Sequence, residues 1–177
     1  MNKKASISLS INALVIIMLS IAMLSGGVAL MYQFIGGAED IKSLMDKKTE
    51  LELERLLINE GQMVALPLHT KIVSRGENHV FGIGILNIGD ENDFILQVKL
   101  NKAIDEYNKL LTGTNAESWL FYNDDKIPLK KNEHYKAAIM VNIPKENAPK
   151  GKYFFNARVI KGGTQYGNTQ SFTVTVP

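Results

Sequence analysis

The chain has no cysteine among its 177 residues, so neither a disulfide scaffold nor a thiolate metal site is available to it. It also has no marked excess of charge of one sign, because 20 Lys and Arg residues are interspersed with 18 Asp and Glu residues. A phosphate backbone is bound by a strongly basic surface, so we expect no nucleic acid partner. Sequons for N-linked sugar are missing as well, since no Asn is followed by Ser or Thr at the second position.

Motifs of catalysis and of cofactor binding are scarce. His69, His79 and His134 are scattered and form no HExxH motif, so surface or loop histidines are the simpler interpretation. The acidic run at 90–93 lacks the spacing of a calcium loop and is typical of a solvated turn. The segment 82–84 (GIG) lacks the third glycine of a dinucleotide loop and lies within a strand pattern, which favours close packing or a bulge. We therefore expect no enzyme, no cofactor and no metal site.

No charged side chain occurs between Lys4 and Glu39, and most of this stretch is apolar. The apolar run is longer than the core of an ordinary secretory signal, which spans about 7–15 residues. Lys3 and Lys4 precede the run, whereas Glu39 and Asp40 follow it. Positive charge favours the cytoplasmic side of a membrane, so the sequence predicts a transmembrane segment with everything after residue 40 outside.

The segment 39–60 has apolar residues at spacings close to three and four, with charges between them and neither Gly nor Pro, as an amphipathic helix requires. The simplest interpretation joins it to the apolar run as one helix over about 9–59, with Gly61 and Pro67 ending it. The predicted domains are a leader at 1–5, a long helix at 6–60 that is apolar over 6–38 and amphipathic over 39–60, and a head at 61–177.

The head has the pattern of a β domain. Short runs rich in β-branched and aromatic residues predict strands at 80–88, 94–100, 135–143, 153–160 and 170–176, with weaker strands at 63–73 and 119–122. In the second strand Phe94, Leu96, Val98 and Leu100 would be buried, with Gln97 and Lys99 facing water. A helix is expected at 102–111. The predicted fold class is α+β, a long N-terminal hydrophobic α-helix followed by an antiparallel immunoglobulin-like β-sandwich.

The short basic leader ending in Lys3, Lys4 and Ala5, the apolar stretch, the amphipathic continuation and the β head together resemble archaeal type IV pilins and archaellins. The resemblance implies cleavage of the leader by a prepilin peptidase after Ala5, with Ser6 as the new amino end. It also implies insertion in the cytoplasmic membrane, transfer by assembly machinery and a homo-oligomeric helical filament at the cell surface. The segments 86–101 and 141–160 resemble, more loosely, the immunoglobulin-like modules of prokaryotic surface proteins.

In such a filament the apolar helices would bury one another, and each large side chain removed from water would contribute about 1.5–3 kcal/mol. The small residues among them would allow the helix backbones to approach closely. The residues expected in this core are Ile11, Leu14, Ile17, Met18, Ile21, Ala22, Leu24, Ser25, Gly26, Ala29, Leu30 and Phe34.

Three functions are therefore open at this point. The first is a structural subunit of an archaeal, type IV pilus-like surface filament, with helices in its core and β domains outside. The second is a single-pass membrane-anchored surface or adhesion protein with an extracellular β-sandwich, and the third is a secreted domain that loses its leader.

Overall fold

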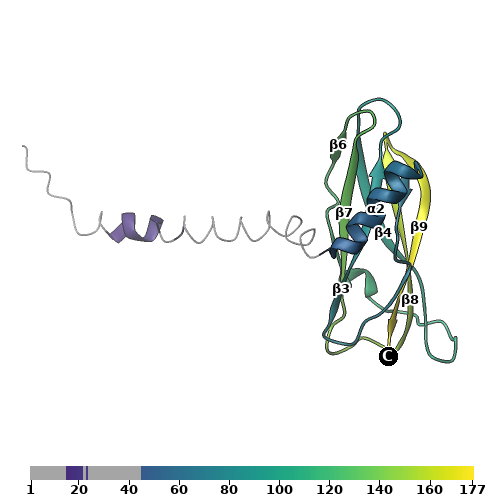
Figure 1. The fold of residues 1–177 in the computed structure, drawn as a ribbon. Helices are drawn as coiled ribbons and strands as arrows, with labels where there is room; N and C mark the ends of the chain where they lie inside the picture. Colours follow the sequence, from purple (N-terminus) through teal and green to yellow (C-terminus); the bar gives the residue numbers. More distant parts are fainter. Residues whose placement is uncertain (1–14, 22, 24–44) are drawn as a thin grey trace, which may run out of the picture. The chain divides into compact units, whose positions relative to one another are not determined.

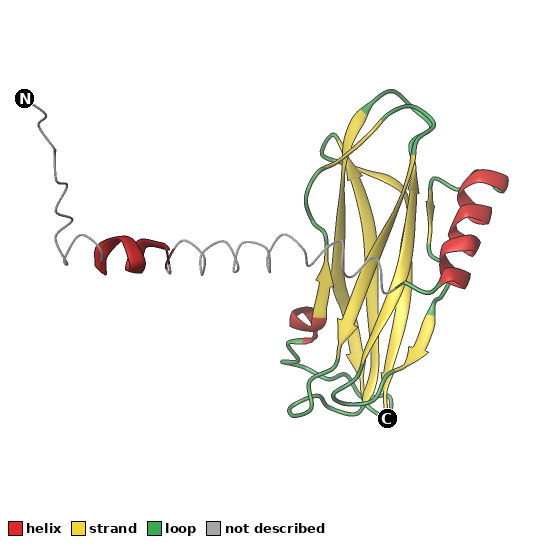
Figure 2. Ribbon diagram, turned by 60° about the vertical axis from the view of Figure 1, so that its left-hand side comes forward, coloured by secondary structure: helices red, strands yellow, loops and turns green. Residues whose placement is uncertain are grey.

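The computed structural model describes residues 15–21, 23 and 45–177. Residues 45–177 form a β-sandwich of two sheets with one helix beside it (Figures 1 and 2). Neighbouring strands pair antiparallel except for β2 and β9, which run parallel. The four-stranded sheet has the order β1 (Val64–Ala65), β3 (Asn78–Leu86), β7 (His134–Asn142) and β5 (Leu120–Tyr122). The five-stranded sheet has the order β2 (Thr70–Ile72), β9 (Thr164–Val176), β8 (Gly151–Lys161), β4 (Asn92–Ile104) and β6 (Ile127–Leu129).

Aromatic side chains from both sheets meet in the core between them. Phe81 of the four-stranded sheet lies with its ring centroid 4.5 Å from that of Phe172, which in turn stacks on Phe155 at 5.2 Å. All three rings are at most 1% exposed. The inward positions alternate with outward ones along each strand, which is the period-2 pattern that a sandwich imposes.

Helix α2 (Lys47–Glu54) and the π-helical turn η1 (Arg55–Asn59) pack against the outer face of the four-stranded sheet. Two glycines of β3 lie beneath them: a Cβ on Gly82 would approach Leu53 to 3.0 Å, and one on Gly84 would approach Leu57 to 2.6 Å. Both leucines are fully buried. The close packing expected of this glycine pair is thus confirmed, and its cause is the seat of a helix.

The buried amide of Asn87 fixes the turn between β3 and β4. Its Nδ2 donates to the carbonyl oxygens of Asp90 at 2.9 Å, Leu129 at 3.0 Å and Lys130 at 3.2 Å. Its Oδ1 accepts hydrogen bonds from the backbone of Gly89 at 3.0 Å and from Nζ of Lys161 at 3.2 Å. The acidic run at 90–93 begins in this turn, as the sequence predicted.

The prediction of one helix from about 9 to 59 is wrong. Asp46 is extended, with φ −68° and ψ 147°, and its carboxylate caps a new helix by accepting a hydrogen bond from the Thr49 backbone at 2.9 Å. An aspartate that bonds the third residue after it starts a helix rather than continuing one. The end of the helical region is as predicted, since Gly61 has the positive φ of 67° that favours glycine at a helix end.

The predicted fold class is also wrong in its helical part. The described residues are mainly β, and their helices are short: 15–21 and 23 are helical, followed by α2 with η1 and by the 3₁₀ turn η2 (Ala116–Trp119). The β-sandwich part of the prediction is confirmed. The resemblance to pilins and archaellins is contradicted, because it required a long apolar N-terminal helix and the described residues contain none.

Within the described residues, no helix combines the length and the apolar character that crossing a membrane would require. The transmembrane helix expected of a pilin is therefore not found there.

The helix predicted at 102–111 is wrong as well. Strand β4 continues to Ile104, and a tight turn follows in which Asp105 Oδ1 accepts hydrogen bonds from the backbones of Tyr107 at 2.9 Å and Lys109 at 2.8 Å. Asn108 has a positive φ of 62°, which a helix interior does not allow. The side-chain bonds of Asp105 thus favour a turn over the helix that the apolar spacing indicated.

Candidate binding site

The outer face of the five-stranded sheet is polar where its inner face is apolar. On β4, Leu96 and Val98 are buried, whereas Gln97 and Lys99 between and beyond them are exposed. On β8, Arg158 is exposed in the same way between buried neighbours. Gln97 and Lys99 face water as the sequence predicted, and the pairing of β4 with β8 brings a second polar strand beside them.

A β-bulge at Asn101 changes which side chains of β4 face outward. Leu100 and Lys102 pair with consecutive residues of β8, so Asn101 between them is the extra residue. Leu100 packs against the core, and Lys102 is exposed opposite Phe154. Without the bulge, strict alternation would turn Lys102 inward, to the side on which Ala103 is now buried.

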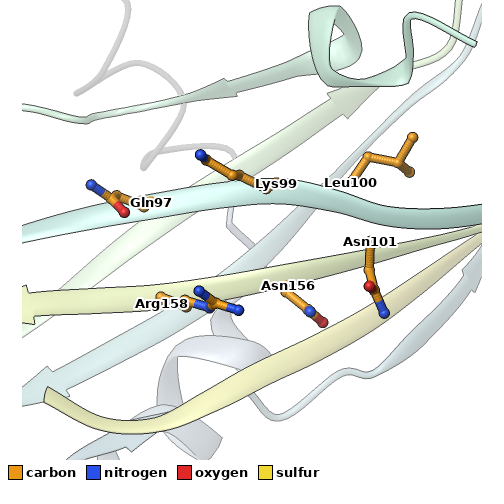
Figure 3. A pocket seen from close by; sticks show the side chains of 6 residues that line it. All are labelled: Gln97, Lys99, Leu100, Asn101, Asn156 and Arg158. Carbon is orange, nitrogen blue, oxygen red and sulfur yellow. The ribbon is translucent and has the colours of Figure 1, made fainter. Parts of the chain in front are cut away.

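The bulge lies beside a hollow of about 220 Å³. It is lined by Gln97, Lys99, Leu100 and Asn101 of β4 and by Asn156 and Arg158 of β8 (Figure 3). The Oδ1 of Asn156 accepts a hydrogen bond from the Ser171 hydroxyl at 2.8 Å, which leaves its N–H groups as donors. The amide of Asn156 and the cationic groups of Lys99 and Arg158 therefore make this hollow rich in hydrogen-bond donors.

Four cationic side chains occupy this face, namely Lys99 and Lys102 of β4 and Lys152 and Arg158 of β8, and we call them the basic ladder. All four are exposed. Within residues 45–177 none of them forms an ion pair. Lys102 lies over the ring of Phe154, with Nζ 5.0 Å from the ring centroid. The ladder thus carries positive charge that forms no direct ion pair within the described part of the chain.

Side chains from η2 and β5 close the edge of β4 beside the ladder. The carboxylate of Glu117 accepts a hydrogen bond from the backbone N–H of Leu100 at 3.1 Å, and the hydroxyl of Tyr122 accepts one from Val98 at 3.2 Å. Unpaired strand edges attract other strands, and these bonds satisfy the two edge groups directly. The carboxylate of Glu117 is therefore engaged with the backbone of β4.

The four-stranded sheet and the helix beside it carry titratable groups of a different kind. Two hydrogen bonds from Thr49 hold the pKa of the Asp46 carboxyl below its ordinary value. Burial lowers the pKa of His79, an effect that the charge of Lys71 strengthens and that of Asp46 opposes. The buried Nε2 of His79 has no hydrogen-bond partner among the residues that the structure describes, and its ring meets that of Phe81 edge-on at 4.9 Å. Asp46 caps α2 and His79 lies on β3, so neither group belongs to the sheet that carries the basic ladder.

The structure places few of the residues that the sequence put in a filament core. Ile17, Met18 and Ile21 lie in the short helical stretch 15–21, with exposed fractions of 49%, 64% and 61%. The processing residues and the remaining core residues lie outside the described residues: Lys3, Lys4, Ala5, Ser6, Ile11, Leu14, Ala22, Leu24, Ser25, Gly26, Ala29, Leu30 and Phe34. The three histidines form no metal-binding cluster within the described ranges.

The comparisons with known proteins give no family. No protein-family model matches the chain, and no curated protein matches its sequence. Among solved structures it is similar to a family 123 glycoside hydrolase from Clostridium perfringens, with 14% identity and a TM-score of 0.48 over 61% of this chain and 22% of that one. It is also similar to PapD-like domain 7 of human CEP192, with 12% identity, a TM-score of 0.47 and 66% and 86% of the two chains covered. The periplasmic chaperone SfaE follows with 10% identity, a TM-score of 0.38 and 64% and 55% covered. At these values the similarities support no inference about function.

Proposed function

We propose that this protein is a non-catalytic binding module that holds an anionic partner on the outer face of its five-stranded sheet. The observation that carries the proposal is the basic ladder beside a hollow whose cations have no carboxylate partner within residues 45–177. A cation that a protein leaves unpaired on a flat face is available to a ligand without first breaking an internal contact.

The other features of the described residues favour binding over catalysis. The hollow contains no histidine or carboxylate among its lining residues, so it has no general acid or base of the usual kind. None of the groups whose pKa values are shifted lines it, namely Asp46, Glu52, Arg55, His79 and Tyr153. Tyr153 is a core residue whose pKa burial raises and whose hydroxyl donates to Pro149 at 2.7 Å. Filament assembly, a homo-oligomer and a cell-surface location stay predictions.

The test is a titration of the full chain with a panel of polyanions, followed by amide chemical shifts. The panel contains an acidic peptide, a sulfated oligosaccharide, a single-stranded oligonucleotide and vesicles of anionic lipid. Binding of any one of them that shifts the amides of β4 and β8, and that weakens with salt, supports the proposal. Shifts confined to the four-stranded sheet, or no binding by any member, would overturn it.

A further inference from the structure

The cations of the basic ladder are spaced along the strands in a regular way. The register pairs Gln97 with Arg158, Lys99 with Asn156, Lys102 with Phe154 and Ile104 with Lys152. Counted on β8, these outward levels lie two residues apart, at 158, 156, 154 and 152. Each level therefore carries one cation, and successive cations are about 6.6 Å apart along the strand direction.

This spacing equals the repeat of an extended polypeptide. Alternate side chains of an extended chain point to the same side and lie about 6.6 Å apart. A segment with an acidic residue at every second position would place its carboxylates over the four levels in turn. From Arg158 to Lys152 the ladder extends roughly 20 Å, the length of about seven extended residues.

Resting on the proposed function, we propose that the partner is an extended acidic segment of another protein, with Asp or Glu at alternate positions, lying along β4 and β8. Carboxylates pair with the ladder, and the donors of the hollow beside Lys99 and Arg158 take one of them by charge-assisted hydrogen bonds. The bulge at Asn101 is part of this site, because it turns Lys102 outward and so fills the third level.

The same face is less suited to nucleic acid. Single strands are held by bases stacked on open aromatic rings as well as by cations. The aromatic ring at the ladder is that of Phe154, and Lys102 already lies over it. The whole chain has a net charge of only +2, which is little for binding a phosphate backbone.

The experiment uses the full chain and two fluorescent peptides of identical composition and charge. In one peptide Glu and Thr alternate, and in the other all Glu residues precede all Thr residues. We expect the alternating peptide to bind at least about fivefold more tightly, because only its carboxylates match the ladder when it is extended. Equal affinities of the two peptides would overturn the inference.

Paired charge reversals locate the site. The variant Lys99→Glu/Arg158→Glu should weaken binding of the alternating peptide about tenfold or more. The control variant Lys131→Glu/Lys145→Glu has the same net charge and reverses two exposed lysines outside β4 and β8, and it should change binding less than about twofold. Thermal unfolding checks that both variants are folded. If the two variants lose affinity equally, the ladder is not the site.

The panel separates failure of this inference from failure of the proposed function. If the oligosaccharide, the oligonucleotide or the vesicle binds the β4 and β8 face and the alternating peptide does not, the acidic-segment inference is overturned and the proposed function stands. If nothing binds this face, both are overturned.

Discussion

The contact between Gly84 and Leu57 offers a direct test of how the helix sits on the sandwich. A Cβ at Gly84 would lie 2.6 Å from Cδ1, 3.0 Å from Cγ and 3.1 Å from Cδ2 of Leu57. The whole leucine would have to move, and it is fully buried between helix and sheet. We therefore expect Gly84→Val to lower the free energy of unfolding by about 1–3 kcal/mol, the usual cost of overpacking.

A double-mutant cycle separates this clash from any other effect that valine at position 84 has on stability. Leu57→Ala alone removes a buried leucine and should cost about 2–5 kcal/mol. In the double variant the alanine makes room for the valine, so the total loss should be smaller than the sum of the two single losses by about 1–2 kcal/mol. Val98→Ala in the other sheet is the control, and its effect should add to that of Gly84→Val.

Urea unfolding followed by the fluorescence of Trp119, the single tryptophan, measures all of these values. For a chain of this size 1 kcal/mol corresponds to about 2–4 °C in Tm, so thermal scans provide a second readout. Full additivity of Gly84→Val and Leu57→Ala, or a Gly84→Val variant as stable as the parent, would refute the direct contact on which the packing argument rests.

Three further changes test other contacts of the fold. Asn87→Leu should cost about 2–3 kcal/mol in urea unfolding, because it leaves the buried carbonyl of Leu129 and the part-buried carbonyls of Asp90 and Lys130 without this donor; a loss below about 0.5 kcal/mol would show that water replaces the amide. Asp46→Ala should cost about 1 kcal/mol at neutral pH by removing the helix cap. The pKa of Asp46 is lowered in the folded protein, so this contribution to stability is present above pH 3.8 and is lost as the pH falls through the lower pKa of the folded state. The free energies of unfolding of parent and variant should therefore converge in acid. His79 has a lowered pKa, so the folded protein favours its neutral form and should lose stability as the pH falls below 6.5. In His79→Phe the urea midpoint should depend less on pH between 7.5 and 5.5 than in the parent. An unchanged dependence of the midpoint on pH would contradict the assignment to His79.

The strands were predictable because their signal is local. Alternation of Phe94, Leu96 and Val98 with polar residues specifies both a strand and its buried face, and the structure has them so. Within the described residues, the prediction of a continuous helix fails at Asp46. The sequence pattern around Asp46 favours a helix, but the bond from the Thr49 backbone to its carboxylate starts a new helix there. Spacing of apolar residues does not reveal where a side chain competes with the backbone for a hydrogen bond.

The basic ladder was not predictable from the sequence, because the sequence shows its lysines but not that they share one face. Lys99 and Lys152 are far apart in the chain, and only the pairing of β4 with β8 brings them to one face. The bulge adds a second obstacle, because it shifts the inward and outward alternation of β4 after Leu100. The segment from Lys102 therefore does not continue the strand pattern, and a helix was predicted there. Register and bulges depend on the partner strand, and a partner distant in sequence leaves no local signal.

The two outer faces of the sandwich differ in whether their cations are paired with carboxylates of the same chain. This difference points to the face that a partner would use. On the four-stranded sheet, glycines let the helix approach, and Lys136 joins it through Glu50 at 3.7 Å and Glu54 at 3.1 Å, so that cation is neutralised within the chain. On the five-stranded sheet the cations of the ladder have no such carboxylates in residues 45–177. An acidic segment on the ladder would therefore repeat, between two molecules, the pairing that the helix makes with Lys136 within one. It would gain these pairs without displacing any part of the sandwich.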